Sequence, residues 1–183
     1  GFPKVDGGSV DAVVPDGAGG WFIGGSFTSV AGIARPGLAR ILGDGRLAAW
    51  VPAAAPNQRV RALARKDDYL YVGGDFTALG GGSGPNYAAA FGVVDGSLAP
   101  WDPKITSLAG GGVYSMLLVG SRLYVGGVFG TVNATARCGA AAVAPASGAL
   151  DAGWDAALGL GGGCGEAHAF APTAGGKIMV GGR

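Results

Sequence analysis

The groups with the greatest capacity for chemistry in this chain are its acidic side chains and its single histidine. His168 follows Glu166 by two residues, and Asp102 and Asp155 each come directly after a tryptophan. General acid–base catalysis requires such groups to converge in one pocket, with pKa values shifted towards the working pH. The two aspartates instead occupy equivalent places in a repeating pattern, which favours a role in turns. We therefore predict that the chain is not an enzyme and has no catalytic residues.

The two cysteines are candidates for metal ligation or for a disulfide. Cys138 and Cys164 lie outside any Cys-x-x-Cys motif, and with one histidine in the chain a zinc site is disfavoured. Both lie in glycine-containing loop contexts, where a disulfide could join one repeat to the next. Two unpaired thiols are the alternative. A disulfide would imply an oxidising compartment.

Other ligand-associated patterns are incomplete. The glycine-rich segments 80–84 and 159–163 are followed neither by Lys-Ser/Thr nor by a helical pattern, so they lack the features of a phosphate-binding loop. The Asp-x-Asp-x-Asp pattern of a calcium loop is also absent from the sequence. We predict no cofactor and no bound metal.

Charge and hydropathy exclude several classes of partner. Charged residues make up 14% of the chain and the net charge is +1, so nothing indicates binding to nucleic acid or to an anionic membrane. No apolar run of the length needed to span a membrane is present. Hydrophobic residues are 49% of the chain, which is too many for a disordered protein.

Two features of the sequence favour a secreted or cell-surface location. The expected disulfide fits an oxidising compartment, and Asn133-Ala134-Thr135 has the pattern of an N-glycosylation site at Asn133. The chain begins with glycine and shows no basic and apolar leader, so a signal peptide, if there was one, is expected to have been removed.

A seven-residue pattern recurs along the whole chain and dominates its organisation. Apolar residues, two glycines, a variable residue and a phenylalanine occupy 21–27, 70–76 and 123–129, and a fourth copy begins at Ile178. The spacing is about 50 residues, which indicates a repeat architecture. Residues 1–9 correspond to the end of a preceding unit.

Each complete unit is expected to hold four short antiparallel strands. Asp44-Gly45, Asp95-Gly96 and Ser147-Gly148 suit tight hairpins between the third and fourth strands. Such units are typical of β-propeller blades, so we predict an all-β chain of three blades and half of a fourth. The blades are expected at about 9–52, 59–103, 113–156 and 167–183. The predicted strands are Val10–Pro15, Trp21–Phe27, Gly37–Leu42 and Leu47–Val51; Val60–Ala64, Tyr69–Phe76, Tyr87–Val93 and Leu98–Trp101; Val113–Val119, Arg122–Phe129, Ala140–Ala144 and Leu150–Trp154; and Ala167–Ala171 and Lys177–Gly182.

The residues that recur are interpreted as packing residues. The tryptophans at the ends of the fourth strands are expected to wedge between blades, with an exposed stripe for carbohydrate stacking as the alternative. The glycine pairs are expected where neighbouring backbones approach closely, and the phenylalanines are expected to fill the space between sheets. These residues are Trp50, Trp101 and Trp154; Gly24, Gly25, Gly73, Gly74, Gly126 and Gly127; and Phe27, Phe76 and Phe129.

The second unit resembles a known repeat family. Tyr71-Val-Gly-Gly-Asp-Phe-Thr77, then Ala88-Ala-Ala-Phe91, then Asp95-Gly-Ser-Leu-Ala-Pro-Trp-Asp-Pro103, is similar to the delta-60 β-propeller repeat. The first unit matches well and the third less so, with Gly130 where threonine stands in the other two. The resemblance implies a propeller fold in secreted or surface-anchored bacterial proteins of unknown function, and it provides no catalytic residues. Fungal cortical polarity markers have a similar Gly-Gly-x-Phe blade.

Two weaker resemblances point to enzymes. Gly73-Gly74-Asp75-Phe76 is similar to a diguanylate cyclase signature, but it lacks the following acidic residue and Asp75 is replaced in the other complete copies. The segment 95–101 resembles the tryptophan-docking motif of quinoproteins, with one residue too many between glycine and tryptophan. The cysteine pair and the cations expected of a quinone site are not found in the sequence.

Three functional hypotheses follow. The first is an extracellular structural or adhesive propeller, whose partners are further blades of the same chain or other copies of itself, because three and a half blades cannot close a ring and would leave open sheet edges. The second is a propeller that binds a glycan or a protein through loops on one face. The third and weakest is a quinoprotein-like enzyme.

Overall fold

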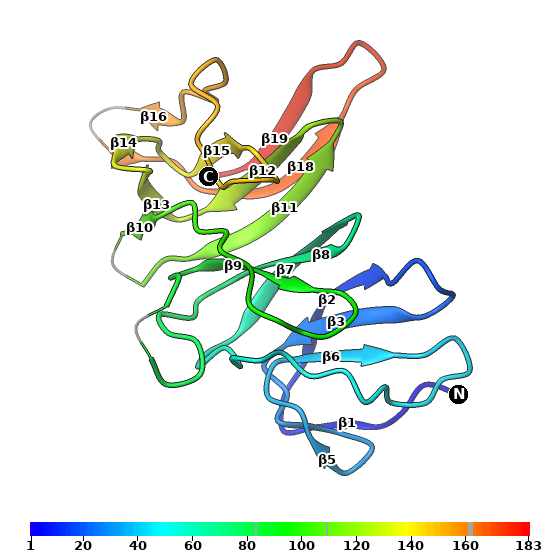
Figure 1. Ribbon diagram of the computed structural model, residues 1–183. Helices are drawn as coiled ribbons and strands as arrows, with labels where there is room; N and C mark the ends of the chain where they lie inside the picture. Colours follow the sequence, from blue (N-terminus) through cyan, green and yellow to red (C-terminus); the bar gives the residue numbers. More distant parts are fainter. Residues whose placement is uncertain (83, 109, 161–162) are drawn as a thin grey trace.

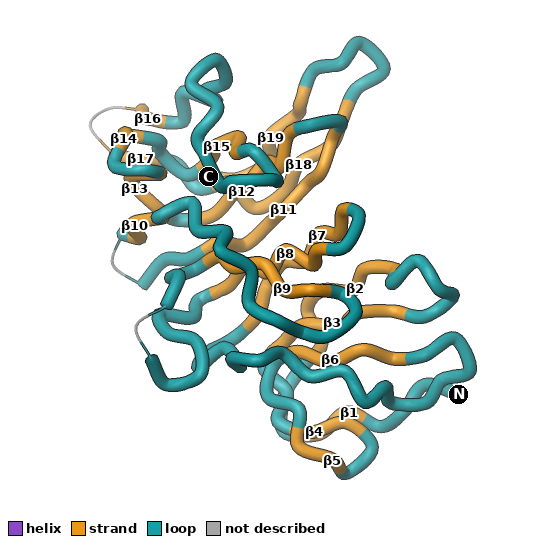
Figure 2. Tube along the Cα trace, viewed as in Figure 1, coloured by secondary structure: helices purple, strands orange, loops and turns teal. Residues whose placement is uncertain are grey.

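The computed structural model describes residues 1–82, 84–108, 110–160 and 163–183, which form strands, turns and loops (Figures 1 and 2). Residues 83 and 161–162, within the two glycine-rich segments, lie outside this description. No helix occurs in the described ranges. The prediction of an all-β chain made of small antiparallel sheets is confirmed.

Four antiparallel sheets, one per sequence repeat, make up most of the molecule. In each of the first three, the second strand lies in the middle, so the first strand is an edge. Sheet 1 contains β2 (Val10–Pro15), β3 (Trp21–Gly25) and β6 (Leu38–Ile41); sheet 2 contains β7 (Val60–Lys66), β8 (Tyr69–Gly74) and β9 (Ala88–Gly92); sheet 3 contains β11 (Val113–Val119), β12 (Arg122–Gly127) and β15 (Ala140–Val143); and sheet 4 contains β18 (Ala167–Pro172) and β19 (Ile178–Gly182).

The fourth strand expected in each complete repeat is reduced to one bridging residue. Gly45, Gly96 and Gly148 have positive φ, as a tight hairpin requires. The chain then leaves the sheet, and the tryptophan that follows packs edge-on against the aromatic residue of the second strand. Three strands and one bridge thus stand where the sequence predicted four strands. The bridges join Leu47 to Ile41, Leu98 to Phe91 and Leu150 to Val143.

Small accessory sheets, which the sequence did not predict, flank the main ones. Before sheets 1 and 3, a short strand pairs with the loop that follows the second strand of that main sheet. Before sheet 2, single bridges take the place of this pairing. Before sheet 4, β16 and β17 pair with each other. They are β1 (Val5–Asp6) with β4 (Ser29–Val30) and β5 (Ile33–Ala34); β10 (Ile105–Ser107) with β13 (Phe129–Val132) and β14 (Thr135–Ala136); β16 (Gly159–Leu160) with β17 (Gly163–Cys164); and the bridges of Leu79 to Pro56 and Gly82.

The four main sheets follow one another in a row from sheet 1 (blue) to sheet 4 (red) in Figure 1. Their first strands β2, β7, β11 and β18 lie side by side in this order. Sheets 2 and 3 therefore each have one face towards the preceding sheet and one towards the next. Within the described residues, sheets 1 and 4 lie at opposite ends of the row and do not close it into a ring.

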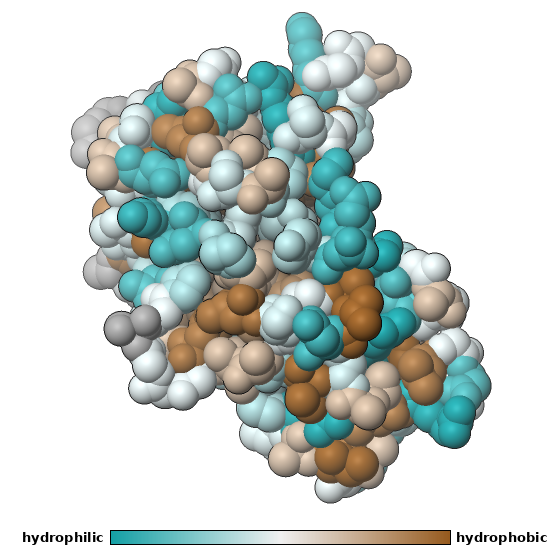
Figure 3. Space-filling model, in the orientation of Figure 1, coloured by the Kyte–Doolittle hydropathy of each residue, from teal (hydrophilic) through white to brown (hydrophobic). Residues whose placement is uncertain are grey.

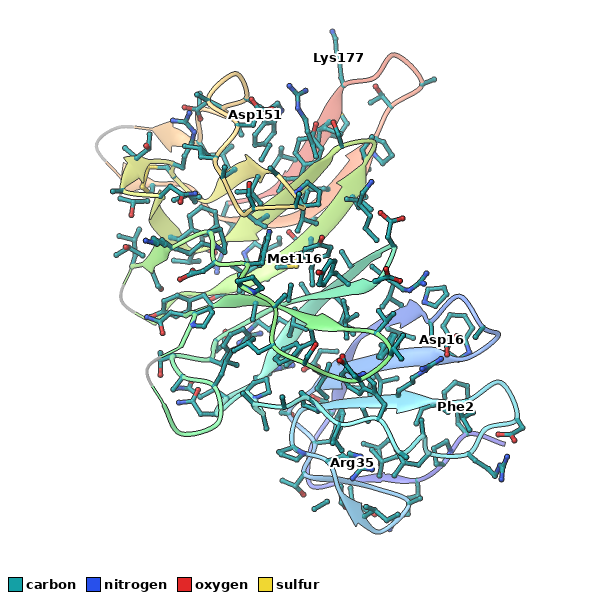
Figure 4. All side chains as sticks on the ribbon, viewed as in Figure 1. Phe2, Asp16, Arg35, Met116, Asp151 and Lys177 are labelled. Carbon is teal, nitrogen blue, oxygen red and sulfur yellow. A yellow bond between two sulfur atoms is a disulfide. The ribbon has the colours of Figure 1, made fainter. Side chains whose placement is uncertain are left out.

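Apolar cores fill the spaces between consecutive sheets. One core joins sheets 1 and 2 and another joins sheets 2 and 3, where Met116 is packed (Figure 4). A third, smaller core lies on the outer face of sheet 1, under Val5 and Leu47. On the face shown in Figure 3, apolar patches are scattered among polar ones and several gather over the lower half, where repeats 1 and 2 lie.

Candidate functional site

In the first three Gly-Gly pairs, the first glycine forms a socket for a side chain of the next sheet. A Cβ atom placed on Gly24 or Gly73 would lie 2.5 or 2.6 Å from a valine methyl carbon, too close for any real contact. Glycine is therefore required by the close approach of two sheets. Val60 fills the socket at Gly24, Val113 fills the one at Gly73, and Phe170 fills the one at Gly126.

The second glycine faces its own sheet. A Cβ atom there would strike the carbonyl oxygen of the residue before the first strand, and the next amide donates a hydrogen bond to the same oxygen at 2.9–3.0 Å. The ladder skips one residue of the first strand at this point, which is a β-bulge. The glycines are Gly25, Gly74, Gly127 and Gly182, opposite Ser9, Arg59, Gly112 and Glu166.

The three phenylalanines of the motif are fully buried. Phe76 belongs to the core between sheets 1 and 2, and Phe129 to the core between sheets 2 and 3. Phe27 lies in the smaller core on the outer face of sheet 1. Each ring thus packs on the side of its sheet that faces the preceding repeat.

Trp50 and Trp101 lock consecutive sheets together. Each ring packs edge-on against the aromatic residue of its own second strand, with centroids 5.0 and 5.1 Å apart. Each indole N–H then donates to a carbonyl of the following sheet, 3.0 Å to Gly92 O and 3.2 Å to Ala144 O. Both rings are buried, so they do not form an exposed stripe.

Tyr71 adds a second polar contact across the junction of sheets 2 and 3. Its ring is the partner of Trp101, and its hydroxyl donates to Pro145 O at 2.8 Å. Burial raises the pKa of Tyr71 to about 12. The hydroxyl is therefore held neutral as a hydrogen-bond donor.

Trp154 has the same intramolecular partner but a different environment. Its ring lies 5.0 Å from Tyr124, at 76° between the planes, as in the other repeats. Its side chain is half-buried, and within the described ranges its indole N–H has no acceptor. A cavity of about 530 Å³ lies beside this pair, lined by Tyr124, Leu150, Asp151 and other residues of repeat 3, with Gly176 across it.

A disulfide joins repeats 3 and 4. Cys138, just before β15, is bonded to Cys164 in β17, with the Cα atoms 4.7 Å apart. The predicted pairing of these two cysteines is confirmed. The bond fastens the loop before the third strand of sheet 3 to the segment that leads into sheet 4.

The sequon asparagine is engaged in the fold. Asn133 lies in the turn between β13 and β14 with a φ of 48°, and its Nδ2 donates to Gly148 O at 2.9 Å. Nδ2 is the atom that would carry a glycan. Glycosylation of the folded chain would therefore break the contact that ties this turn to the Ser147-Gly148 hairpin.

The bulges place four side chains in one row. Asp11, Arg61, Tyr114 and His168 are the skipped residues of the four first strands. Their side chains bridge consecutive repeats in three ways. Asp11 binds Arg59 with both oxygens at 2.6 and 2.7 Å, Arg61 lies over the Tyr114 ring at 4.8 Å, and the Tyr114 and His168 rings stack at 5.5 Å. We call these four residues the bulge row.

Charged neighbours neutralise the bulge row. Arg61 Nε donates to Asp75 at 2.6 Å, and the hydrogen bonds from Arg59 lower the pKa of Asp11. His168 Nε2 and a carboxylate oxygen of Glu166 are hydrogen-bonded at 2.9 Å, and this bond lowers the pKa of Glu166. Arg59 and Arg61 thus each have an acidic partner, so the row can offer hydrogen bonds to a ligand without a strong field of one sign.

The acidic candidates from the sequence do not converge on one site. Glu166 and His168 are adjacent, at one end of the bulge row. Asp102 and Asp155 instead each accept a backbone N–H two residues ahead, at 2.8 Å. This is the turn role that the sequence favoured.

Sequence reasoning missed the remaining members of the bulge row. Asp11, Arg61 and Tyr114 follow the first residue of a strand, and no motif distinguishes them. The one available signal is that this position changes type from repeat to repeat, whereas the packing positions keep theirs.

Searches for related proteins gave no guide to this site: no family model, no curated protein and no solved structure matches the chain. Within the described residues, histidine, cysteine and acidic side chains nowhere gather in the groups of three that a metal ion would need. The same residues include no helix able to cross a membrane.

Proposed function

We propose that the chain is a non-enzymatic, extracellular structural or adhesive module of the β-propeller type, similar to the delta-60 repeat proteins. In this proposal the four sheets are blades, and the first strands are the inner strands. One observation carries it: the glycine socket and the tryptophan lock are repeated with the same geometry at two successive junctions. The recurring side chains thus join one sheet to the next, which is what a scaffold requires.

Two further observations support an extracellular location. The disulfide between repeats 3 and 4 is of the kind that persists in oxidising compartments. Charged residues are few, and no cluster of one sign marks an intracellular nucleic-acid partner.

Surface labelling of the producing cells tests the proposal. Lys177 projects into solvent from the turn between β18 and β19 and is available to an amine reagent (Figure 4). A membrane-impermeant amine reagent should label the protein on intact cells or in the medium. Beads coated with the protein should in addition adhere to those cells. Labelling only after lysis would contradict the location, and no adhesion above albumin-coated beads would contradict the adhesive role.

A second candidate function is recognition of a glycan or protein by the bulge row. The observation that favours it is variation among equivalent positions: these four partly exposed residues are aspartate, arginine, tyrosine and histidine, while the packing residues repeat. Positions free of packing demands are where a repeat protein can carry specificity.

Binding arrays separate this candidate from a purely structural role. Wild-type protein should bind a glycan or peptide on a broad array, and Arg61→Ala should lose that binding. Arg46→Ala is the matched control, because Arg46 pairs with Asp44 at an exposed hairpin away from the row. Silence of the wild-type protein, or equal binding by Arg61→Ala, would rule out the row as the binding site.

A further inference from the structure

We propose that repeat 2 carries an open groove that binds an arginine side chain of a partner polypeptide. The groove has a volume of about 360 Å³ and is lined by Pro85, Leu98, Ala99, Pro100, Trp101 and Asp102. We call it the repeat 2 groove. Such a groove would deepen the proposed adhesive function, on which the assignment rests, by defining the chemical group that the partner presents.

Repeats 1 and 3 each fill the equivalent place with an arginine of their own. In repeat 1, Arg35 (labelled in Figure 4) donates from Nη1 to the preceding carbonyl at 2.9 Å and from Nη2 to Ala48 O at 3.4 Å. In repeat 3, Arg137 donates to the preceding carbonyl at 2.8 Å and to Ala152 O at 3.5 Å. Both guanidinium groups thus hold the segment that leads to the tryptophan of the same repeat.

The arginine of repeat 3 is held by a carboxylate as well. Arg137 lies 3.4 Å from a carboxylate oxygen of Asp155, and its side chain is only 11% exposed. Asp155 directly follows Trp154, just as Asp102 directly follows Trp101 in repeat 2. Repeat 3 therefore shows how a backbone carbonyl and the carboxylate after the tryptophan bind a guanidinium together.

Repeat 2 lacks this arginine. Counted back from the third strand, Pro85 occupies the place of Arg35 and Arg137. A proline side chain is shorter than an arginine side chain and carries no hydrogen-bond donor. The place that arginine fills in the other two complete repeats is therefore left open as the repeat 2 groove.

The acceptors of the guanidinium remain in repeat 2. Ala99 O corresponds to Ala48 O, because each residue follows the bridging leucine of its repeat. Asp102 accepts a hydrogen bond from the backbone N–H of Lys104 at 2.8 Å. Within the described ranges, Asp102 forms no ion pair and Ala99 O accepts no hydrogen bond. One carboxylate and one carbonyl are therefore available to a cation from outside the chain.

The walls of the groove suit the rest of an arginine side chain. Leu98 is 38% exposed and Pro100 is also exposed, so the methylene groups of an arginine can pack on apolar surface while the charged end reaches Asp102. A planar guanidinium can donate to a carboxylate and a carbonyl at once, which the point charge of lysine does less well. The same apolar surface is available to the residues that flank the arginine in a polypeptide.

Backbone amide spectra of the intact protein, titrated with N-acetyl-arginine methylamide, test the groove. The amides of Ala99, Trp101 and Asp102 should shift saturably, with a dissociation constant of about 1–10 mM for this single side chain. Asp102→Asn should weaken binding about five-fold, because it removes the charge and keeps the oxygen that accepts from Lys104 N. Pro85→Arg should abolish binding by placing an arginine of the chain itself in the groove.

Asp155→Asn is the matched control. Its carboxylate follows a tryptophan in the same way but is already paired with Arg137, so this variant should bind the probe like the wild type. N-acetyl-lysine methylamide should bind at least about five-fold more weakly than the arginine probe. Circular dichroism and thermal melting should show that every variant is folded.

Three results would overturn the proposal: no saturable shift up to about 50 mM probe, equal binding of the lysine probe, or undiminished binding by Asp102→Asn and Pro85→Arg. Tighter binding of free L-arginine than of the blocked probe would indicate a site for the amino acid and would overturn the polypeptide partner.

Adhesion of coated beads separates this proposal from the proposed function. Beads coated with Pro85→Arg should adhere to the producing cells less than beads coated with the wild type. Equal adhesion would overturn the groove as the partner's site and leave the adhesive function intact. Binding of the arginine probe by a wild type that does not adhere would support the groove and contradict the adhesive function.

Discussion

The junction between sheets 2 and 3 and the junction between sheets 3 and 4 use equivalent residues but are closed by different means. At the first, Trp101 is buried, and both its N–H and the Tyr71 hydroxyl bind carbonyls across the junction. At the second, Trp154 stays half-exposed beside Tyr124, and a disulfide joins the two repeats. A covalent bond thus stands where the aromatic lock is incomplete.

Phe170 shows the same substitution of one contact for another. Its ring enters the socket at Gly126 and lies 6.1 Å from Tyr124, where the earlier junctions place a valine. The larger ring covers part of the aromatic surface that sheet 4 would otherwise leave open. The junctions therefore differ at the glycine socket as well as at the tryptophan.

The largest difference between the two junctions is expected on removing the tryptophans. Trp101→Ala should lower the free energy of unfolding by about 3–5 kcal/mol, because it empties a buried site and removes the indole hydrogen bond to Ala144 O. Trp154→Ala should lower it by about 1 kcal/mol, since less apolar area is lost. Urea unfolding measures both free-energy changes, provided that the dependence of the free energy on urea concentration is the same for the variants and the wild type. Equal losses would show that the half-exposed ring is as well packed as the buried one.

The disulfide is expected to stabilise its own junction more than the others. Replacing Cys138 and Cys164 together by serine should lower the free energy of unfolding by about 2–4 kcal/mol. Hydrogen exchange should quicken first in β18 and β19, while the amides of β8 keep their protection. Uniform loss of protection along the chain would mean that the repeats unfold as one unit.

The glycine sockets allow a test with the smallest side chain. Gly73→Ala should lower the free energy of unfolding by about 1–3 kcal/mol, because the new Cβ atom meets Val113 and Met116 of sheet 3. Gly181→Ala should change it by less than about 0.5 kcal/mol, since its Cβ atom meets only Ala169 at 3.8 Å. Thermal melting of the two variants and of the wild type measures both changes. A large cost at Gly181 would show that its socket is not open.

The smallest effect is expected from the hydroxyl of Tyr71 and is confined to alkaline solution. The pKa of Tyr71 is raised to about 12, above the value of about 10 in an unfolded chain. Stability from this group is therefore fully present below about pH 10 and is lost as the pH rises towards 12. Urea unfolding at a series of alkaline pH values should show a shallower decline for Tyr71→Phe. An identical decline of stability with pH in Tyr71→Phe and the wild type would show that another group causes the alkaline loss of stability.

Much of the architecture could be predicted from local signals in the sequence. The Gly-Gly-x-Phe repeat located the middle strands, and Asp-Gly or Ser-Gly located the hairpins at Gly45, Gly96 and Gly148. The pairing of Cys138 with Cys164 followed from their loop contexts. These features depend on residue type and short spacing, which a sequence displays directly.

The fourth strands and the accessory sheets could not be read in the same way. Leu47 and its equivalents begin a strand-like pattern, but Trp50 and Trp101 are buried against the next repeat instead of extending the ladder, a tertiary contact that the local pattern does not display. Ser29–Val30 and Ile33–Ala34 are two-residue strands, too short to show an alternation. The bulge row was missed because a bulge is a property of the pairing register, which depends on both strands at once.

The same bulge at the start of all four first strands has a consequence for aggregation. Each of these strands is an unpaired edge, and a regular edge invites another chain to add a strand. A bulge displaces one residue from the ladder and increases the local twist, so the edge no longer offers an even series of donors and acceptors. With Asp11, Arg61 and His168 at these points, the bulged ends of the four adjacent edges are poor templates for a further strand.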